Sequence, residues 1–180
     1  KKIPPGSDHL ICTPWMLVER CPVSSTTTRA TLFNISMVHT REHLMRAVYE
    51  GIGYNLRWIL ENYSRDYGFS CDDFRIIGGG ALDDAWMQII ADITGKRFSV
   101  VKDPRNAGAV GAAIVALIGL GELPGFGSAK DFVQVEKHYE PDPVNRKIYN
   151  DLFDDYKNVY YALEGAYIKA NGDRFKGEEQ

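Results

Sequence analysis

The sequence has few cysteines, little net charge and no long apolar run, and each shortage excludes a class of protein. Cys12, Cys21 and Cys71 are its three cysteines. Their odd number and wide spacing predict free thiols in a reducing compartment, without a disulfide framework. A net charge of −3 gives no sign of the basic surface that nucleic-acid binding requires. We therefore expect no nucleic-acid partner.

The longest apolar run, residues 107–120, is rich in glycine and too short to span a bilayer. The chain begins Lys-Lys-Ile-Pro-Pro-Gly, without an initiator Met and without the apolar segment of a signal peptide. These features predict a cytoplasmic protein with no membrane partner. The missing Met is consistent with a fragment of a longer chain.

What remains is the composition of an ordinary globular protein, because 44% of the residues are hydrophobic and 25% are charged. A chain of 180 residues can bury a core, and nothing in it requires two domains. We predict a single domain over residues 1–180. Strands that alternate with helices from residue 73 onward predict a mixed α/β sheet covered by helices.

The first half of the chain predicts two strands and a long helix. Residues 10–18 are apolar and β-prone, interrupted by Pro14, which suits an edge strand. Residues 31–38 predict a second strand. Thr40 is the expected N-cap of the helix. Its core face is predicted from apolar residues at three- and four-residue steps. They are Leu44, Val48, Ile52, Leu56, Ile59 and Tyr63.

Gly51 and Gly53 form helices poorly, so within this helix they predict close packing against another segment. The second half of the chain predicts a further series of elements. They are strands over residues 74–77 and 97–101, and helices over residues 83–94, 106–120, 128–133 and 142–169.

Gly78, Gly79 and Gly80 lie between the apolar pair Ile76-Ile77 and a helix, and Ala81 follows them. This order predicts a strand, a tight turn and a helix start. Residues without a Cβ let the backbone approach a ligand, and free N–H groups at a helix start bind polar groups. The alternative is a turn whose glycines serve only the packing of strand on helix.

The segment from Phe74 to Gly95 continues through Gly-Gly-Gly-Ala and Trp-Met-Gln to Ala-Asp-Ile-Thr-Gly. It resembles the signature near the C-terminal end of the FGGY carbohydrate kinases, the xylulokinase-like sugar kinases. Collinear matches extend the resemblance over residues 10–171. They include Arg29 to Ser36, His39 to Gly51, the small-residue helix Asn106 to Leu117, and Tyr139-Glu-Pro-Asp-Pro.

The resemblance implies an actin-like, ribonuclease-H-like ATPase fold and the C-terminal, nucleotide-binding half of a two-domain sugar kinase. The complete enzyme would transfer the γ-phosphoryl group of ATP to a sugar hydroxyl, with ketopentoses such as xylulose as expected substrates. Its cofactors would be ATP and Mg²⁺, the metal held mainly by the N-terminal half. The resemblance places the catalytic base in that half too, so we assign no catalytic residue here and expect the isolated chain to be inactive. The N-terminal domain is the expected partner, and a homodimer is an open alternative.

Asp83 and Asp84 stand at the helix start that follows the glycine turn. Two carboxylates there would repel a triphosphate, so the turn suits the nucleoside end of ATP better. The resemblance agrees, since the matching turn of the family packs against adenosine and Asp84 falls at a polar adenine contact. Helix capping is the alternative for both residues.

Asn106 opens a helix of small residues that another backbone can approach closely, which makes it a second candidate nucleotide contact. Many family members have Glu at this position, and helix capping is again the alternative. Glu19-Arg20 resembles the family's Gly-Glu-Arg near the sugar, but Val18 replaces the glycine. These two departures favour a second hypothesis, an actin-like binding module that has lost productive ATP binding.

His39 and His43 have the spacing of two metal ligands on one helical face. A structural zinc site needs further ligands at fitting positions, and none follows. We therefore predict no metal site on this chain.

Overall fold

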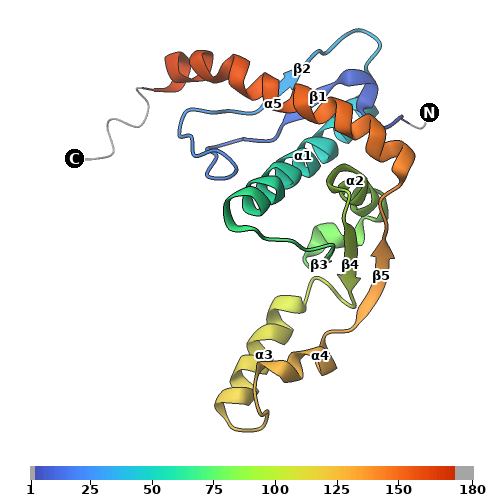
Figure 1. The fold of residues 1–180 in the computed structure, drawn as a ribbon, viewed down its shortest axis with the longest axis vertical. Coiled ribbons are helices and arrows are strands. Elements are labelled where there is room, and N and C mark those ends of the chain that lie inside the picture. Colours follow the sequence, from blue (N-terminus) through green and yellow to red (C-terminus); the bar gives the residue numbers. More distant parts are fainter. Residues whose placement is uncertain (1–2, 173–180) are drawn as a thin grey trace. The chain divides into compact units, whose positions relative to one another are not determined.

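The computed structural model describes residues 3–172, which belong to two units. Of these residues, 3–70, 92–94 and 142–172 belong to the first unit, and 71–91 and 95–141 belong to the second. Both are mixed arrangements of helices and strands (Figure 1). No helix within residues 3–172 is long and apolar enough to cross a membrane.

Two long helices, α1 (Arg41–Tyr67) and α5 (Pro143–Asn171), dominate the first unit (Figure 1). A 3-10 turn, η1 (Ser7–His9), precedes β1 (Ile11–Thr13), which pairs antiparallel with β2 (Thr31–Phe33). The two strands form a small sheet of their own. This unit therefore contains both strands predicted in the first half of the chain.

Both strands are shorter than predicted, because the backbone turns away soon after each begins. Pro14, which has no N–H to donate, directly follows β1. Asn34 takes a left-handed conformation (φ 68°) directly after β2. The prediction of a strand through residue 38 is wrong, and Met37 and Val38 lie exposed beyond its end.

The length of α1 agrees with the sequence, but the predicted core face is confirmed only in part. Leu44 and Val48 pack against the buried cluster that contains Ala47, whereas Tyr63 is exposed. The six residues of the predicted stripe are half-buried or exposed. The buried residues of α1 are His43, Ala47, Glu50, Gly51, Gly53, Tyr54 and Trp58. A Cβ on Gly51 would lie 2.1 Å from the carbonyl oxygen of Cys12. Small residues therefore set the buried face, because they let β1 reach the helix backbone.

The predicted close packing at the two helical glycines is confirmed. A Cβ on Gly53 would lie 2.8 Å from Ile93 Cδ1, just as a Cβ on Gly51 would collide with β1.

Aromatic rings fill the space between α1 and α5. Tyr54 lies 5.2 Å from Tyr156 and 6.0 Å from Tyr149, centroid to centroid. α5 contributes a buried, largely aromatic face, formed by Tyr149, Leu152, Phe153, Tyr156, Val159 and Tyr160.

Glu50 is a carboxylate buried among donors from three segments. Its Oε1 accepts from the Gly6 N–H and the Tyr149 hydroxyl, both at 2.9 Å, and from Arg46 Nε at 2.7 Å. Its Oε2 accepts from the Ser7 hydroxyl at 2.7 Å. A buried charge is tolerated when it is paired and hydrogen-bonded in this way. Glu50 therefore joins the start of the described chain to α1 and α5.

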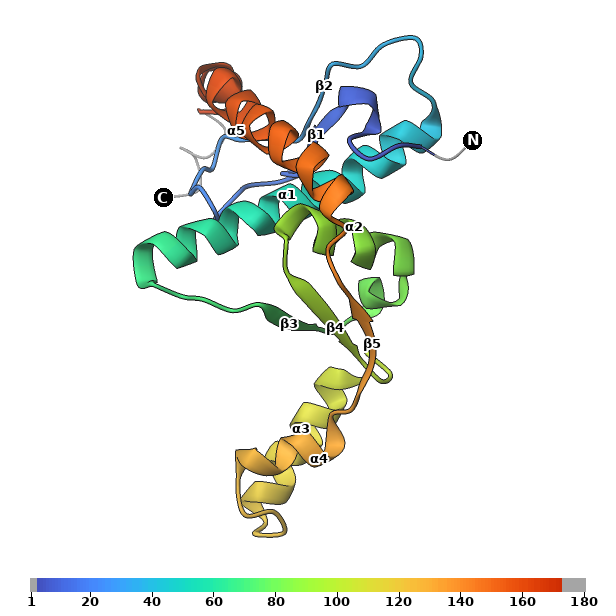
Figure 2. The ribbon, with the colours of Figure 1, turned by 45° about the vertical axis from the view of Figure 1, so that its right-hand side comes forward.

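The second unit contains a three-stranded mixed sheet (Figure 2). β3 (Asp73–Ile76) runs parallel to β4 (Arg97–Val101), and β4 pairs antiparallel with β5 (Val135–Tyr139). The helical elements are η2 (Gly79–Leu82), α2 (Asp84–Thr94), α3 (Ala107–Gly119), η3 (Phe126–Ser128) and α4 (Ala129–Phe132). Apart from β5, which the sequence did not predict, these elements agree with prediction to within a few residues.

The free thiols predicted from the cysteine count are confirmed, since all three cysteines are unpaired. Cys12 is buried in β1, against Leu10 and Ala47. Burial raises the pKa of its thiol to about 11. This cysteine therefore behaves as a small apolar core residue.

Candidate functional site

The glycine turn after β3 is tied to the loop before α3. Gly78 has φ 98°, a conformation that side chains rarely adopt, and its N–H donates to the carbonyl oxygen of Pro104 at 2.8 Å. The next two residues of that loop are Arg105 and Asn106. The structure therefore brings together two of the predicted segments, the turn and the start of α3.

The three glycines have different environments. A Cβ on Gly80 would lie 2.4 Å from Cζ3 of Trp86, so the indole ring packs directly on this residue. A Cβ on Gly79 would find only Arg105 Nε, at 4.0 Å, which is ordinary contact. The packing alternative therefore describes Gly80, whereas Gly79 leaves its backbone open to a ligand. Ala81 is buried below them.

The two adjacent aspartates act differently. Asp83 is the N-cap of α2, because its Oδ1 accepts from the Trp86 N–H at 3.0 Å. Asp84 does not cap the helix. Its Oδ1 accepts from Tyr139 Oη at 2.6 Å and Lys137 Nζ at 2.7 Å, both on β5. Sequence reasoning missed these two partners, since they lie more than 50 residues downstream on a strand that was not predicted.

The hydrogen bonds to Asp84 stabilise its charged form. Donation from Lys137, and then from Tyr139, lowers the pKa of the Asp84 carboxyl below its usual range. The same bond raises the pKa of Lys137. Burial, followed by donation to Asp84, raises the pKa of Tyr139 to about 12. Near neutral pH this site therefore presents a carboxylate held by an ammonium and a protonated phenol.

Asn106 stands at the N-cap position of α3, but its side chain does not cap the helix. Its Nδ2 donates to Asp103 Oδ2 at 2.7 Å. The alternative that Asn106 serves as a helix cap is therefore wrong, and its role as a nucleotide contact stays a prediction. Asp103 itself has a left-handed backbone (φ 50°), which helps to bring its carboxylate toward Asn106.

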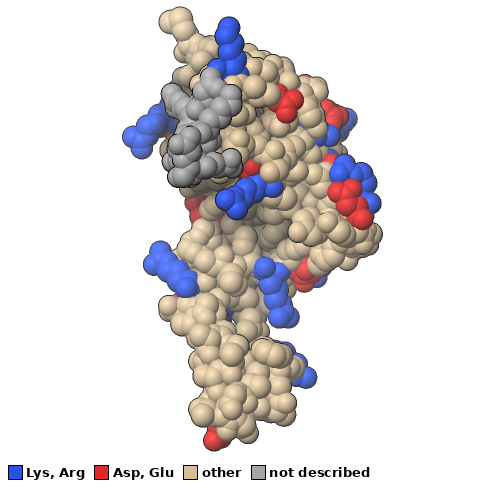
Figure 3. All heavy atoms as spheres, turned by 90° about the vertical axis from the view of Figure 1, so that its left-hand side faces the viewer, with Lys and Arg blue, Asp and Glu red and all other residues tan. Residues whose placement is uncertain are grey.

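The small-residue face of α3 is open. Within residues 3–172, no atom outside the helix's own backbone lies within 4 Å of a Cβ placed on Gly108 or Gly111. Within α3 only Ile114 is buried. In Figure 3 few charged side chains lie over the lower part of the view, where α3 and α4 are found. The predicted close approach to these small residues has no partner among residues 3–172.

Glu19 is bound within its own loop. Its Oε1 accepts from the backbone N–H groups of Arg20 and Cys21, both at 2.9 Å, and its backbone pairs with Ser25. In this arrangement one carboxylate oxygen organises the loop. Glu19 and the glycine turn belong to different units, so the structure gives no common site for them.

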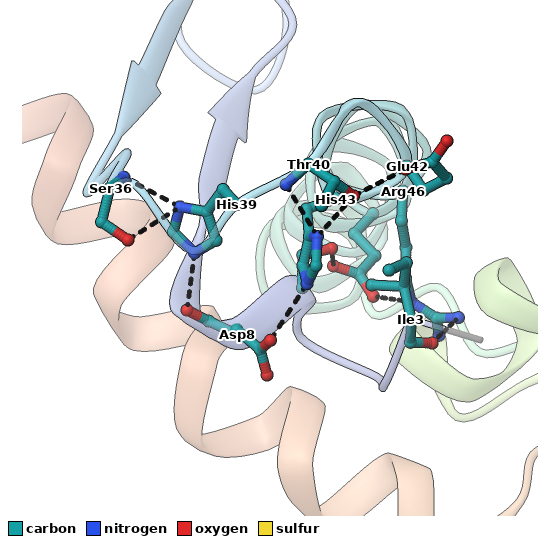
Figure 4. A network of polar contacts seen from close by, with 10 residues as sticks. Ile3, Asp8, Ser36, His39, Thr40, Glu42, His43 and Arg46 are labelled. Carbon is teal, nitrogen blue, oxygen red and sulfur yellow. Dashed lines mark hydrogen bonds and ion pairs between the residues drawn. The ribbon is translucent and has the colours of Figure 1, made fainter. Parts of the chain in front are cut away.

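His39 and His43 form a polar network with Asp8 (Figure 4). Backbone N–H groups of Ser36 and Thr40 donate to Nδ1 of the two rings, each at 3.0 Å. Each Nε2 then carries the proton and donates to Asp8, from His43 to the carboxylate at 3.0 Å and from His39 to the carbonyl at 3.2 Å. With both nitrogens of each ring engaged, the network leaves no lone pair for a metal.

Ser99, Asp73 and His138 form the residue set of a catalytic triad but not its geometry. The buried Ser99 hydroxyl donates to Asp73 Oδ1 at 2.6 Å and lies 2.9 Å from His138 Nδ1. The serine is in the middle, so its proton goes to the carboxylate and no base activates it. These residues instead connect all three strands of the sheet.

Comparison with known proteins agrees with this fold. Residues 3–120 match the model of the C-terminal domain of the FGGY family of carbohydrate kinases. Over 160 residues the chain is 36% identical to xylulose kinase of Bacillus subtilis, covering 88% of the chain and 32% of that protein. It is 28% identical to gluconokinase of Bacillus licheniformis, covering 94% of the chain and 33% of that protein.

A solved structure of ligand-bound xylulose kinase from Lactobacillus acidophilus superposes with a TM-score of 0.82. The sequences are 28% identical, and the match covers 92% of this chain and 34% of that one. The chain thus spans about a third of the length of these relatives. The predicted actin-like α/β fold is confirmed, and the chain belongs to the FGGY family of carbohydrate kinases, whose C-terminal domain it matches.

Proposed function

We propose that the chain is the C-terminal, nucleotide-binding half of a kinase that transfers the γ-phosphoryl group of ATP to a sugar hydroxyl. Its contribution is to bind the adenosine end of ATP. The relatives named as xylulose kinase and gluconokinase support a sugar substrate, and a ketopentose such as xylulose is the first candidate.

The observation that carries this proposal is the open backbone at Gly79, followed in the chain by the ionised carboxylate of Asp84 at the start of α2. The neighbouring glycines are used by the fold, one for a positive φ and one for contact with Trp86. At Gly79 the residue has no Cβ of its own to keep a flat ring from the main chain, and Arg105 Nε lies 4.0 Å from the Cβ position. The carboxylate of Asp84, with 65% of its side chain exposed, supplies the acceptor that an adenine amino group or a ribose hydroxyl needs.

The charges near the turn are more balanced than the two adjacent carboxylates suggest. Lys137 pairs with Asp84, and the guanidinium of Arg105 lies beside Gly79. The expected repulsion of a phosphate chain is therefore reduced at the turn itself. The placement of adenosine at Gly79 therefore depends on the open backbone and on the Asp84 acceptor, and less on repulsion of the phosphates.

Residues 3–172 contain no group of three or more His, Cys, Asp or Glu side chains arranged to hold a metal ion. On the family resemblance, the proposal assigns Mg²⁺, the catalytic base and most sugar contacts to the rest of the kinase chain. The N-terminal domain remains the proposed partner, and dimerisation and a cytoplasmic location remain predictions.

Two neighbouring aspartates provide a matched test in the full-length protein. Asp84→Ala should weaken ATP binding by about 1–2 kcal/mol, roughly 5- to 30-fold, because it removes the ligand's acceptor. Asp83→Ala should instead lower the free energy of unfolding by about 1 kcal/mol, because it removes the cap of α2, and should leave ATP affinity unchanged. Calorimetric titration with ADP and ATP, beside a thermal melt, measures both quantities.

The glycine turn provides a second pair of variants for testing the proposal. Gly79→Val should raise the KM for ATP much more than the KM for sugar, because the branched side chain would occupy the open face. Gly80→Ala should mainly destabilise the fold through Trp86. An equal rise of the KM for ATP and for sugar in Gly79→Val, with unchanged ADP binding in Asp84→Ala, would contradict the proposed site and favour the alternative in which the glycines serve only packing.

A further inference from the structure

The strand β5 presents two donors to a single oxygen of Asp84. Lys137 and Tyr139 are two residues apart, so their side chains leave the same face of the strand. Both hydrogen bonds end on Oδ1, at 2.7 and 2.6 Å. Within residues 3–172, Oδ2 of Asp84 has no hydrogen-bond partner. One carboxylate oxygen is therefore fixed, and the other is available.

The two donors differ in how firmly they are held. Tyr139 is 9% exposed and lies opposite Phe98 in the β4–β5 ladder. The side chain of Lys137 is half exposed, on a flexible stem. A short bond from a buried phenol restricts a surface carboxylate more than an exposed ion pair does, since exposed pairs contribute little. Tyr139 is therefore the main constraint on Asp84, and Lys137 supports it.

We propose that Tyr139 and Lys137 are positioning residues for Asp84, and that they hold its carboxylate so that Oδ2 accepts from the exocyclic amine of a 6-aminopurine. This inference rests on the proposed function. It also implies selectivity for adenine over guanine nucleotides. A 6-oxopurine presents an oxygen where adenine has its amine, and two acceptor oxygens cannot form a hydrogen bond without a proton between them.

Protonation supports the same arrangement. The phenol of Tyr139 has its pKa raised to about 12, so it stays a donor through the neutral and alkaline range. The pKa of Asp84 is lowered by both donors, so its carboxylate stays an acceptor in mildly acidic solution. The hydrogen bond between Tyr139 and Asp84 therefore persists from mildly acidic to alkaline pH.

The alternative is that Asp84 simply joins α2 to β5 at the surface. Under that alternative, loss of the tyrosine hydroxyl would change stability and leave nucleotide binding alone. The two roles differ in their dependence on Asp84. A positioning residue affects nucleotide affinity only while Asp84 is present. A structural residue affects the stability of the protein, whether or not a nucleotide is bound.

The test uses the full-length protein and calorimetric titration with ADP and GDP, beside KM values for ATP and sugar. Tyr139→Phe should weaken ADP binding roughly 3- to 10-fold and narrow the preference for ADP over GDP. Lys137→Met should have a smaller effect in the same direction. Lys130→Met, at an exposed position of α4 in the same unit, is the control and should change neither the ADP affinity nor the preference for ADP over GDP. The KM for sugar should not move in any of the three.

A double-mutant cycle decides the mechanism. Combined with Asp84→Ala, Tyr139→Phe should cause no further loss of ADP affinity, because the group through which it acts is gone. Additive losses, or unchanged affinity and base preference in Tyr139→Phe while Asp84→Ala weakens binding, would overturn the positioning role and leave the proposed function standing. Unchanged ADP binding in Asp84→Ala itself would overturn both.

Discussion

Replacement of Gly51 by alanine tests the closest contact in the first unit. Its Cβ would lie 2.1 Å from the carbonyl oxygen of Cys12 and 3.1 Å from the carbonyl carbon. Real Cβ atoms essentially never come closer than 3.0 Å to such an atom. The obstacle is backbone, so no rotamer change relieves it. Either β1 or α1 must move by roughly 1 Å, which is an overpacking strain.

Two opposing effects set the size of the loss. Alanine forms a helix better than glycine by about 1 kcal/mol. Overpacking in a well-packed core costs about 1–3 kcal/mol, and a rigid neighbour favours the upper end. We expect Gly51→Ala to lower the free energy of unfolding by about 2 kcal/mol.

Gly165→Ala is the matched control, because Gly165 also lies in a long helix and, among the described residues, no atom outside that helix's backbone lies within 4 Å of its Cβ position. This variant should gain about 0.5–1 kcal/mol. Urea titration of the protein, followed by the fluorescence of Trp15 and Trp58 in the first unit, compares the two. Equal stabilisation by both substitutions would refute the claim that β1 packs directly on the backbone of α1.

Three further predictions concern other parts of the fold. Cys12 should resist alkylation near neutral pH, while the two other cysteines react. Mass spectrometry of the native protein would measure this, and rapid labelling of all three cysteines would contradict the burial of Cys12. Glu50→Ala should lower the free energy of unfolding by about 3–5 kcal/mol, whereas Glu61→Ala, which breaks an exposed ion pair, should cost about 0–1 kcal/mol in the same urea titration. Gly80→Ala should shift the fluorescence of Trp86 and lower the melting temperature, and an unchanged melt would exclude the tight contact between them.

Helix boundaries and central strands were predictable because their signals are local. β4 begins and ends as predicted, and α2 ends at Gly95 (φ 67°) as its C-cap glycine indicates. The buried face of α1 was only partly predictable from apolar spacing. It is set by Gly51, Glu50 and other residues that a hydrophobic pattern ignores. β5 was missed because charged residues occupy its exposed middle.

The candidate site was also predictable only in part from the sequence. The glycine turn and the two aspartates were visible in sequence, because turn, cap and family signature coincide there. Which aspartate caps α2 was not visible, since neighbours at a helix start have equal claims. The partners of Asp84 come from Lys137 and Tyr139, and only the pairing of β5 with β4 brings them near. The conformational preferences of neighbouring residues do not indicate which distant strands will pair.

The Glu50 network determines where a shorter version of the protein can begin. Two of its four donors, Gly6 and Ser7, lie only a few residues after the first described residue. A truncation that starts at β1 would keep every strand and long helix of the first unit, yet leave the buried carboxylate with only Arg46 and Tyr149. An expression boundary chosen from secondary structure alone would therefore fail, and a suitable one lies before Gly6.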